Sequence, residues 1–282
     1  MNHFRKMIKS PHQKFSVLMA LYWKESPEYL SQCLESIFNS TVLPYEVLIV
    51  LDGPIPKKLM FVLKKYNLKL PLRLIPLDKN VGLPKALNQG ILNCKTNLIA
   101  RFDTDDICHN LRFERQLLFM KRNPDVAVVG SHVGEFVNTI NKIYSIRRVA
   151  IDHKSIVRYA KIKNPLNHPS VMYRKAAIKD VGYYPPYAFA FEDYALWLNL
   201  ILRGYKLSNL DEILVFMRAG PNQAKRRRGI KYAKIECKFA SDYYHYGFFK
   251  LYEMIVFLVI RLPFRFLPNM VLWMSYKHII RR

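Results

Sequence analysis

Short apolar runs alternate with segments of helical spacing through the first half of the chain. Near-continuous apolar runs of this length are typical of parallel strands covered on both faces. They occupy residues 15–21, 46–51, 72–75 and 98–102. Between them, apolar residues recur every three or four positions over residues 27–38, 57–66 and 84–90. This alternation predicts a doubly wound α/β domain.

In the second half of the chain, the pattern of apolar and polar residues is less regular. The predicted helices there cover residues 112–122, about 151–160, and a segment beginning at residue 192. The predicted strands are 126–130, 171–173, 207–210 and 213–217, with a polar-alternating hairpin or ribbon over 132–150. From residue 221 the composition becomes basic and aromatic. We therefore expect an α/β domain over residues 1–220 and an extension over residues 221–282.

Three carboxylates follow the run at 98–102, where a strand would leave the sheet: Asp103, Asp105 and Asp106. Like charges this close repel, so the cluster needs a cation or shared protons. Oxygen ligands at the carboxyl end of a strand suit Mg²⁺ or Mn²⁺, which in turn would bind a phosphate-bearing ligand. The alternative is an acidic turn that caps the helix beginning near Arg112.

Two more segments place polar residues at the ends of predicted elements. Asp52 follows the strand at 46–51, where an acidic residue often accepts hydrogen bonds from a ribose or a base; an ordinary Asp-Gly turn is the alternative. After Asn80, Pro84 fits the first turn of a helix, and Lys85 with that helix N-terminus would face an anion. A plain amphipathic helix is the alternative for this second segment.

A pair of carboxylates also opens the helix predicted from residue 192. The turn-rich loop 164–170 and the aromatic loop 185–191 precede this pair, Glu192 and Asp193. Carboxylates in a first turn are favoured by the helix dipole, so simple capping explains them as well as chemistry does.

The formal net charge of +24 predicts an anionic partner: nucleic acid, an anionic membrane surface or a phosphorylated substrate. The four cysteines form no close pair and no metal-ligand spacing, which is typical of a reducing cytosol. The first ten residues lack a long apolar core, and no stretch reaches the ~18 uncharged apolar residues of a membrane span. We expect a cytoplasmic protein without a signal peptide.

The extension concentrates this charge. Residues 221–282 hold 13 basic and 3 acidic residues, a net of +10, interleaved with aromatics. A basic amphipathic segment with aromatic residues is typical of a helix that lies on an anionic membrane surface. We prefer this interpretation because the apolar content of the segment exceeds what RNA binding needs. A helical bundle packed on the α/β domain and a nucleic-acid patch are the alternatives.

Six segments in this order resemble family 2 glycosyltransferases of the GT-A fold, over roughly residues 14–230. They are the strand 15–21, the strand and turn 46–53, the segment 80–90, the acidic stretch 101–106, the segment 167–174 and the Glu192-Asp193 pair with Trp197. The acidic stretch resembles the DXD region and the pair resembles the ED motif of the family. The run Lys225-Arg226-Arg227-Arg228 and the extension resemble the branch that builds amylovoran and O-antigen units. The resemblance implies a Rossmann-like mixed sheet with flanking helices.

The resemblance also implies roles for single residues. On the donor side, Asp52 would bind the uridine, Asp103 the ribose or sugar, and Asp105, with Asp103, the Mn²⁺ or Mg²⁺ ion. Asp193, beside Glu192, would be the general base. Further donor-side residues would be Tyr22, Glu25, Asn80, Lys85, Arg226, Arg227 and Arg228, and acceptor-side residues His168 and Trp197. Many members have a histidine ligand after the last strand, and Arg218-Ala219-Gly220 has none.

These expectations add up to a metal-dependent inverting glycosyltransferase. The donor would be a UDP-sugar, and the acceptor a polyprenyl-diphosphate-linked saccharide of a bacterial O-antigen, capsule or exopolysaccharide. We expect the protein on the inner face of the plasma membrane, in contact with its anionic inner leaflet, with no nucleic acid as partner. A nucleotidyltransferase of the same fold and a basic nucleic-acid-binding protein are the alternatives.

Overall fold

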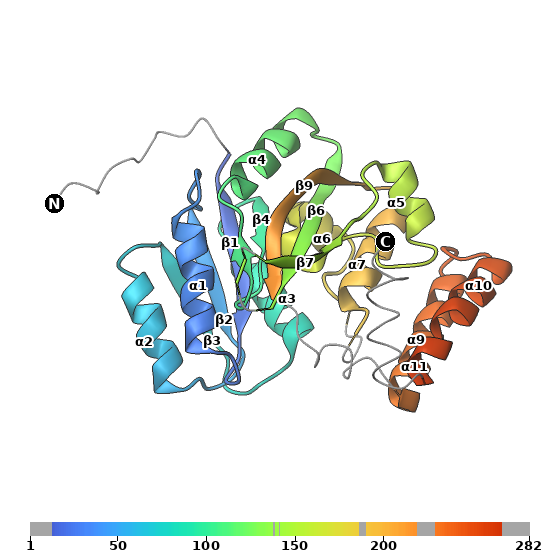
Figure 1. Ribbon diagram of the computed structural model, residues 1–282. Helices are drawn as coiled ribbons and strands as arrows, with labels where there is room; N and C mark the ends of the chain where they lie inside the picture. The colour runs from blue at the N-terminus through green and yellow to red at the C-terminus, as the bar shows by residue number, and fades with distance from the viewer. Residues whose placement is uncertain (1–12, 138, 141, 186–189, 219–228, 267–282) are drawn as a thin grey trace.

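The computed structural model describes residues 13–137, 139–140, 142–185, 190–218 and 229–266. Within them, one nine-stranded sheet carries helices on both faces (Figure 1). The strand order is β3-β2-β1-β4-β8-β6-β9-β5, and β7 pairs with β6 beside this path. Parallel and antiparallel pairs occur in the same sheet, so the mixed α/β fold expected from the sequence is confirmed.

The first half of the sheet is parallel and follows the sequence pattern. Its strands are β3 (Leu72–Pro76), β2 (Glu46–Leu51), β1 (Phe15–Leu21) and β4 (Leu98–Arg101). The connecting helices are α1 (Pro27–Phe38), α2 (Lys57–Tyr66) and α3 (Leu83–Asn93). Each strand and helix predicted between residues 15 and 102 is present.

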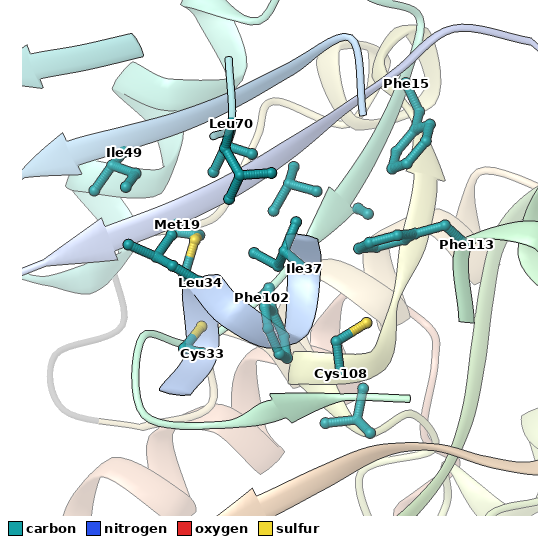
Figure 2. Close-up of a cluster of buried hydrophobic side chains, with 14 of the residues drawn as sticks. Phe15, Met19, Cys33, Leu34, Ile37, Ile49, Leu70, Phe102, Cys108 and Phe113 are labelled. Carbon is teal, nitrogen blue, oxygen red and sulfur yellow. The ribbon is translucent and has the colours of Figure 1, made fainter. Parts of the chain in front are cut away.

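Alternate residues of β1 point to opposite faces of the sheet, and each face has its own apolar layer. Val17 and Met19 belong to the cluster under α1, α2 and α4 (Arg112–Arg122). Leu18 belongs to the cluster under α3 and α7 (Glu192–Leu202). Figure 2 shows the first cluster, where Phe102 reaches toward Ile37 of α1. Burial on both faces explains why every residue of this strand except Ser16 is apolar.

The second half of the sheet is mostly antiparallel. β8 (Met172–Arg174) runs antiparallel to β4 and to β6 (Val126–Phe136), and β7 (Ile143–Arg147) forms the predicted ribbon with β6. β9 (Lys206–Arg218) is one strand parallel to β6 where two were predicted. Its pairing shifts register between Leu210 and Ile213, so residues 211–212 are absorbed as an irregularity rather than a break.

Three short elements of the α/β domain have no counterpart among the predictions: β5 (Ile107–Cys108), α6 (Lys175–Asp180) and the 3₁₀ helix η1 (His168–Ser170), which lies within the predicted loop 164–170. β5 exists through its antiparallel pairing with Val215 and Phe216 of β9. A partner so distant in sequence leaves no local pattern. The helix predicted near 151–160 is α5 (His153–Tyr159).

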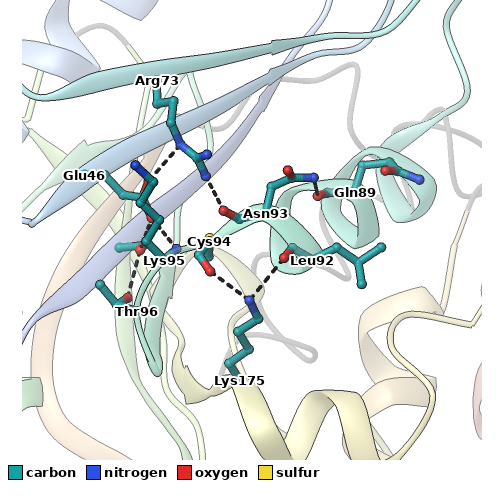
Figure 3. Close-up of polar contacts among 10 residues, drawn as sticks. Glu46, Arg73, Gln89, Leu92, Asn93, Cys94, Lys95, Thr96 and Lys175 are labelled. Atoms are coloured by element: carbon teal, nitrogen blue, oxygen red, sulfur yellow. Dashed lines mark hydrogen bonds and ion pairs between the residues drawn. The ribbon is translucent and has the colours of Figure 1, made fainter.

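Helix α3 is held tightly at its C-terminal end. Lys175 donates hydrogen bonds to the carbonyl oxygens of Leu92 and Cys94 at 3.1 and 2.7 Å, and Arg73 donates to that of Asn93 (Figure 3). Cations here complement the helix dipole. Within the helix, a Cβ on Gly90 would approach a methyl group of Leu18 to 2.2 Å, so only glycine allows this close contact with β1.

The extension contains three helices, α9 (Gly229–His245), α10 (Leu251–Arg261) and α11 (Pro263–Phe266). Helices α9 and α10 pack against α7, and α11 packs against α9. They lie at one edge of the molecule (Figure 1). Their apolar cluster joins Tyr194 and Leu198 of α7 to Phe239, Tyr243 and Phe257. The predicted boundary at residue 220 lies outside the described residues. Among those described, no helix has both the length and the apolar character needed to cross a bilayer.

Candidate active site

The four parallel strands end at the same edge of the sheet, where open α/β sheets bind ligands. The segments that leave this edge begin at Tyr22 after β1, Asp52 after β2, Leu77 after β3 and Phe102 after β4. Most of the predicted donor-side residues therefore lie on neighbouring segments.

Asp52 is buried and holds the loop in front of α3. Its carboxylate accepts hydrogen bonds from the backbone nitrogens of Val81 (2.7 Å) and Gly82 (3.1 Å) and from Nδ2 of Asn80 (3.0 Å). Gly53 has a φ of 87°, and a Cβ there would lie 2.8 Å from the nitrogen of Asn80. The Asp-Gly turn thus brings two loops together, and Asn80 and Lys85 are exposed at this edge.

The acidic turn after β4 is tied to its surroundings by two contacts. Buried Arg101 donates from both terminal nitrogens to the two carboxylate oxygens of Asp103. Glu25 accepts a hydrogen bond from the hydroxyl of Thr104 at 2.6 Å, which joins the loop after β1 to this turn. Burial and the charges of Asp103 and Glu25 raise the pKa of Asp105 to about 7.

The capping alternative for this turn is wrong. The residue before the first turn of α4 is Leu111, and no side chain makes a capping hydrogen bond there. The three carboxylates therefore need an explanation other than the start of α4.

Arg218, at the end of β9, closes the acidic turn from the other side. Its backbone nitrogen donates to Oδ1 of buried Asp106 at 2.9 Å, and its Nε donates to the carbonyl oxygen of Asp105 at 3.1 Å. Its guanidinium lies 3.8 Å from the centre of the Tyr29 ring. Burial, with the charges of Asp105 and Asp103, raises the pKa of Asp106 well above its ordinary value. In the sequence, this position drew attention only because the segment Arg218-Ala219-Gly220 contains no histidine that could bind a metal.

Tyr184 is a buried residue that contacts His168 and Asn88, and no pattern in the sequence pointed to it. Its hydroxyl is 2.8 Å from Nε2 of His168, and its backbone nitrogen and oxygen are both bound by the side chain of Asn88 at 2.9 Å. Burial raises the pKa of Tyr184; Arg101 opposes this shift and Asp193 adds to it. The charges of Arg101 and Asp193 therefore both act on this one tyrosine.

Two predicted acceptor-side residues lie beside Tyr184. Burial and the charge of Arg101 lower the pKa of His168 well below its ordinary value, so this imidazole is neutral at pH 7. Trp197 is fully buried, and its ring centre is 6.2 Å from that of His168. The prediction for Trp197 is corrected accordingly: it packs behind His168 and cannot itself touch an acceptor.

Asp193 lies in the first turn of α7, after Glu192. Its Oδ2 accepts a hydrogen bond from Nδ2 of Asn164 at 2.7 Å, and its Oδ1 from the nitrogen of Tyr194 at 2.8 Å. The preceding Phe191 has a φ of 70°, which is rare for a bulky residue. Its ring stacks on Phe239 of α9, with 4.8 Å between centres. Packing from the extension therefore helps to fix the start of α7.

A divalent ion at the acidic turn would have to take most of its ligands from substrate and water. Among the described residues, no three His, Cys, Asp or Glu side chains are grouped to hold a metal. Mg²⁺ needs only one or two carboxylates when phosphates complete its shell. Burial, together with the charges of Asp103 and Glu25, raises the pKa of Asp105, and a bound cation would offset the repulsion between these carboxylates. The predicted arginines 226–228 lie outside the described residues.

Comparison with known proteins identifies glycosyltransferases as relatives of this chain. The model of glycosyl transferase family 2 matches residues 16–182. A UDP-Gal:alpha-D-GlcNAc-diphosphoundecaprenol beta-1,3-galactosyltransferase of Escherichia coli is 40% identical over 95% of this chain and 97% of its own length. The amylovoran biosynthesis glycosyltransferase AmsE of Erwinia amylovora is 41% identical over 79% of this chain and 82% of its own.

Solved structures agree on the fold. The S. aureus TarS fragment 1–349 in complex with UDP-GlcNAc superposes with a TM-score of 0.64 at 20% identity. The match covers 82% of this chain and 67% of that fragment. Similarity at this level of identity concerns the arrangement of strands and helices alone.

Proposed function

Because the chain belongs to glycosyl transferase family 2, we propose that it moves a hexose or N-acetylhexosamine from a UDP-sugar to a saccharide on a polyprenyl diphosphate. The product would be a repeat unit of a bacterial surface polysaccharide. The observation that carries the proposal is the E. coli relative, whose name states both a UDP-sugar and a diphosphoundecaprenol acceptor. Its similarity spans the α/β domain and most of the extension. Family membership sets aside the nucleotidyltransferase alternative.

The donor is proposed to bind at the edge where β1, β2 and β4 end. Asp52 and Asn80 would receive the uridine with help from Tyr22 and Glu25, and Lys85 would face the diphosphate. Asp103 would hold the ribose or sugar. The exposed positions of Asn80 and Lys85 support this arrangement.

Asp105, with Asp103, is proposed to hold Mn²⁺ or Mg²⁺ when the donor is present. Such an ion would act as a Lewis acid that offsets the negative charge growing on the departing UDP. Arginines 226–228 would add positive field near the same diphosphate.

Asp193 is proposed as the general base of an inverting transfer. The acceptor oxygen bonds to the anomeric carbon as the bond from that carbon to UDP breaks, and the hydroxyl proton passes to the Asp193 carboxylate. Asn164, bound to Oδ2 of Asp193, would orient this carboxylate. Inversion needs one base opposite the leaving group, and a base of this kind contributes about 10²–10⁴-fold.

The acceptor would be met at the inner face of the plasma membrane, since its polyprenyl chain is buried there. A test is UDP release by the full chain with several UDP-sugars, in Mn²⁺ or EDTA, with a synthetic lipid-diphosphate-GlcNAc acceptor. We expect release that requires both acceptor and metal. Turnover without any lipid-linked acceptor, or turnover unchanged in EDTA, would contradict the proposal.

A further inference from the structure

Helix α10 presents an apolar face to solvent. Tyr252, Ile255, Val256 and Val259 follow the i, i+3, i+4, i+7 spacing of one helix face, and Leu251 and Ile260 flank it. All six side chains are between 42% and 65% exposed. On the opposite side only Phe257 is fully buried against α9. A continuous apolar face on a helix is normally covered, so this face lacks its partner among the described residues.

The charge of the protein decides which partner fits. Two copies of a chain with a net charge of +24 repel each other, whereas an anionic bilayer attracts one. Exposed Lys231 and Lys234 lie on the neighbouring helix α9, and exposed Lys250 directly precedes α10. Tyr252, Tyr246 and Phe266 place exposed aromatic rings in the same part of the chain, as is common at membrane interfaces.

The face is also fixed relative to the candidate base. Buried Glu236 of α9 forms ion pairs with Arg261 of α10 and Arg265 of α11. Tyr243 of α9 donates its hydroxyl hydrogen bond to the Ala195 carbonyl oxygen of α7 at 2.8 Å. Helix α7 begins at Glu192 and Asp193. A surface bound by α10 is therefore held at a set position relative to Asp193.

We propose that the exposed face of α10, formed by Leu251, Tyr252, Ile255, Val256, Val259 and Ile260, docks the enzyme on the anionic lipid bilayer that carries its acceptor. The proposal rests on the lipid-linked acceptor of the proposed function and adds the surface that meets the lipid. Apolar side chains enter the boundary between headgroups and acyl chains, and the lysines bind anionic headgroups.

The test is co-sedimentation of the full chain with vesicles of equal parts phosphatidylglycerol and phosphatidylethanolamine. The variant is the double substitution Ile255→Glu and Val259→Glu, at side chains 49% and 65% exposed. The control is Phe61→Glu with Leu68→Glu, which adds the same charge at side chains 71% and 80% exposed near α2, at the opposite edge of the molecule (Figure 1). We expect the α10 variant to lose at least about tenfold in partition and the control to bind as the unaltered protein does.

Two outcomes would overturn the proposal: equal partition of the two variants, or a dimer in lipid-free sedimentation that becomes a monomer in the α10 variant. The second would identify the face as an interface between copies. Circular dichroism of both variants confirms that the fold is kept.

Activity separates this proposal from the proposed function. On an acceptor with a short water-soluble lipid chain, the α10 variant should turn over as the unaltered protein does, and it should fail only on acceptor in vesicles. Vesicle binding through α10 with no transfer to either acceptor would contradict the function and leave the docking surface standing. Normal transfer to acceptor in vesicles by the α10 variant would contradict the docking surface and leave the proposed function standing.

Discussion

Arg101 and Asp103 form a bidentate ion pair across one intervening residue at the end of β4. The exposed fractions of the two side chains are 2% and 36%. The arginine is thus inside the protein and the carboxylate at its surface, so the two partners are not equivalent.

Removing the carboxylate should cost more stability than its position suggests. Asp103→Ala leaves the buried charge of Arg101 without its counter-ion, and we expect a loss of about 2 kcal/mol in the free energy of unfolding, below the 3–5 kcal/mol of a wholly buried pair. Urea unfolding measures it. Adding Arg101→Met should recover part of the loss, and a double variant less stable than Asp103→Ala would contradict this account.

The raised pKa of Asp105 predicts a pH-dependent affinity for metal. With a pKa of about 7, the carboxyl of the metal-free protein is protonated at lower pH, so Mn²⁺ must displace a proton. The affinity for Mn²⁺ with UDP should fall about tenfold per pH unit below that value and level off above it. Titration calorimetry between about pH 5.5 and 8.5 measures this, and the same slope in Asp105→Asn would refute the assignment.

The same shift has a consequence for stability without metal. A carboxyl whose pKa rises on folding binds more protons in the folded than in the unfolded protein, between its ordinary value of 3.8 and about 7. Stability should therefore decline as pH rises through this window. Asp105→Asn should show a smaller decline in melting temperature across the same range.

Asp193 should affect turnover rather than donor binding. Asp193→Asn keeps the size of the side chain and its bond from Asn164 can re-form, but it cannot take a proton. We expect kcat to fall about 10²–10⁴-fold with the donor KM little changed. Asn164→Ala should cause a smaller fall, because it loosens the carboxylate without removing it. A large rise in donor KM in Asp193→Asn would instead indicate a role in donor binding.

Glu236 should stabilise the junction of α9, α10 and α11. Burial alone would raise the pKa of Glu236, but its bonds to Arg265 and Arg261 outweigh burial and hold the pKa below its ordinary value. Glu236→Gln should cost about 3 kcal/mol at pH 7. A lowered pKa contributes stability that is fully present above the ordinary value of 4.5 and is lost below it, so the difference should shrink only as pH falls below 4.5.

A matched control for Glu236 lies on the same helix. Exposed Lys238 forms an i, i+4 ion pair with the partly buried Asp242, so Lys238→Ala should cost no more than about 0.5 kcal/mol. Urea unfolding of the unaltered protein, Glu236→Gln and Lys238→Ala, at pH 7 and at a pH below 4.5, measures these losses. Equal losses in the two variants would show that the buried cluster does not stabilise the junction.

The fold could be predicted where the local pattern of apolar residues was enough to identify an element. Residues 47–51 are apolar because both faces of β2 are covered, and residues 27–38 show the spacing of a helix with one buried face. β5 and the unbroken β9 could not be predicted, because Ile107 becomes a strand only by pairing with Phe216. Such pairing depends on the finished fold.

The site shows the same division. Asp52, Asp103 and Asp193 were noticed because each directly follows a strand or opens a helix. Arg101 and Tyr184 were missed, since an arginine inside an apolar run and a tyrosine before a proline carry no sign of their partners. Only the folded structure shows that Arg101 binds Asp103 and that Tyr184 lies within hydrogen-bond distance of His168.

The apolar cluster between α7 and α9 governs how shortened forms of the protein would behave. A chain that stopped at residue 220 would lose Phe239 and Tyr243, which cover Tyr194 and Leu198. Those newly bared side chains would make the fragment prone to aggregate, and the first turn of α7 would lose its backing. Poor solubility or lost turnover of such a fragment would therefore say little about lipid or substrate contact by the missing helices, whereas single exchanges on their outer surface leave that backing intact.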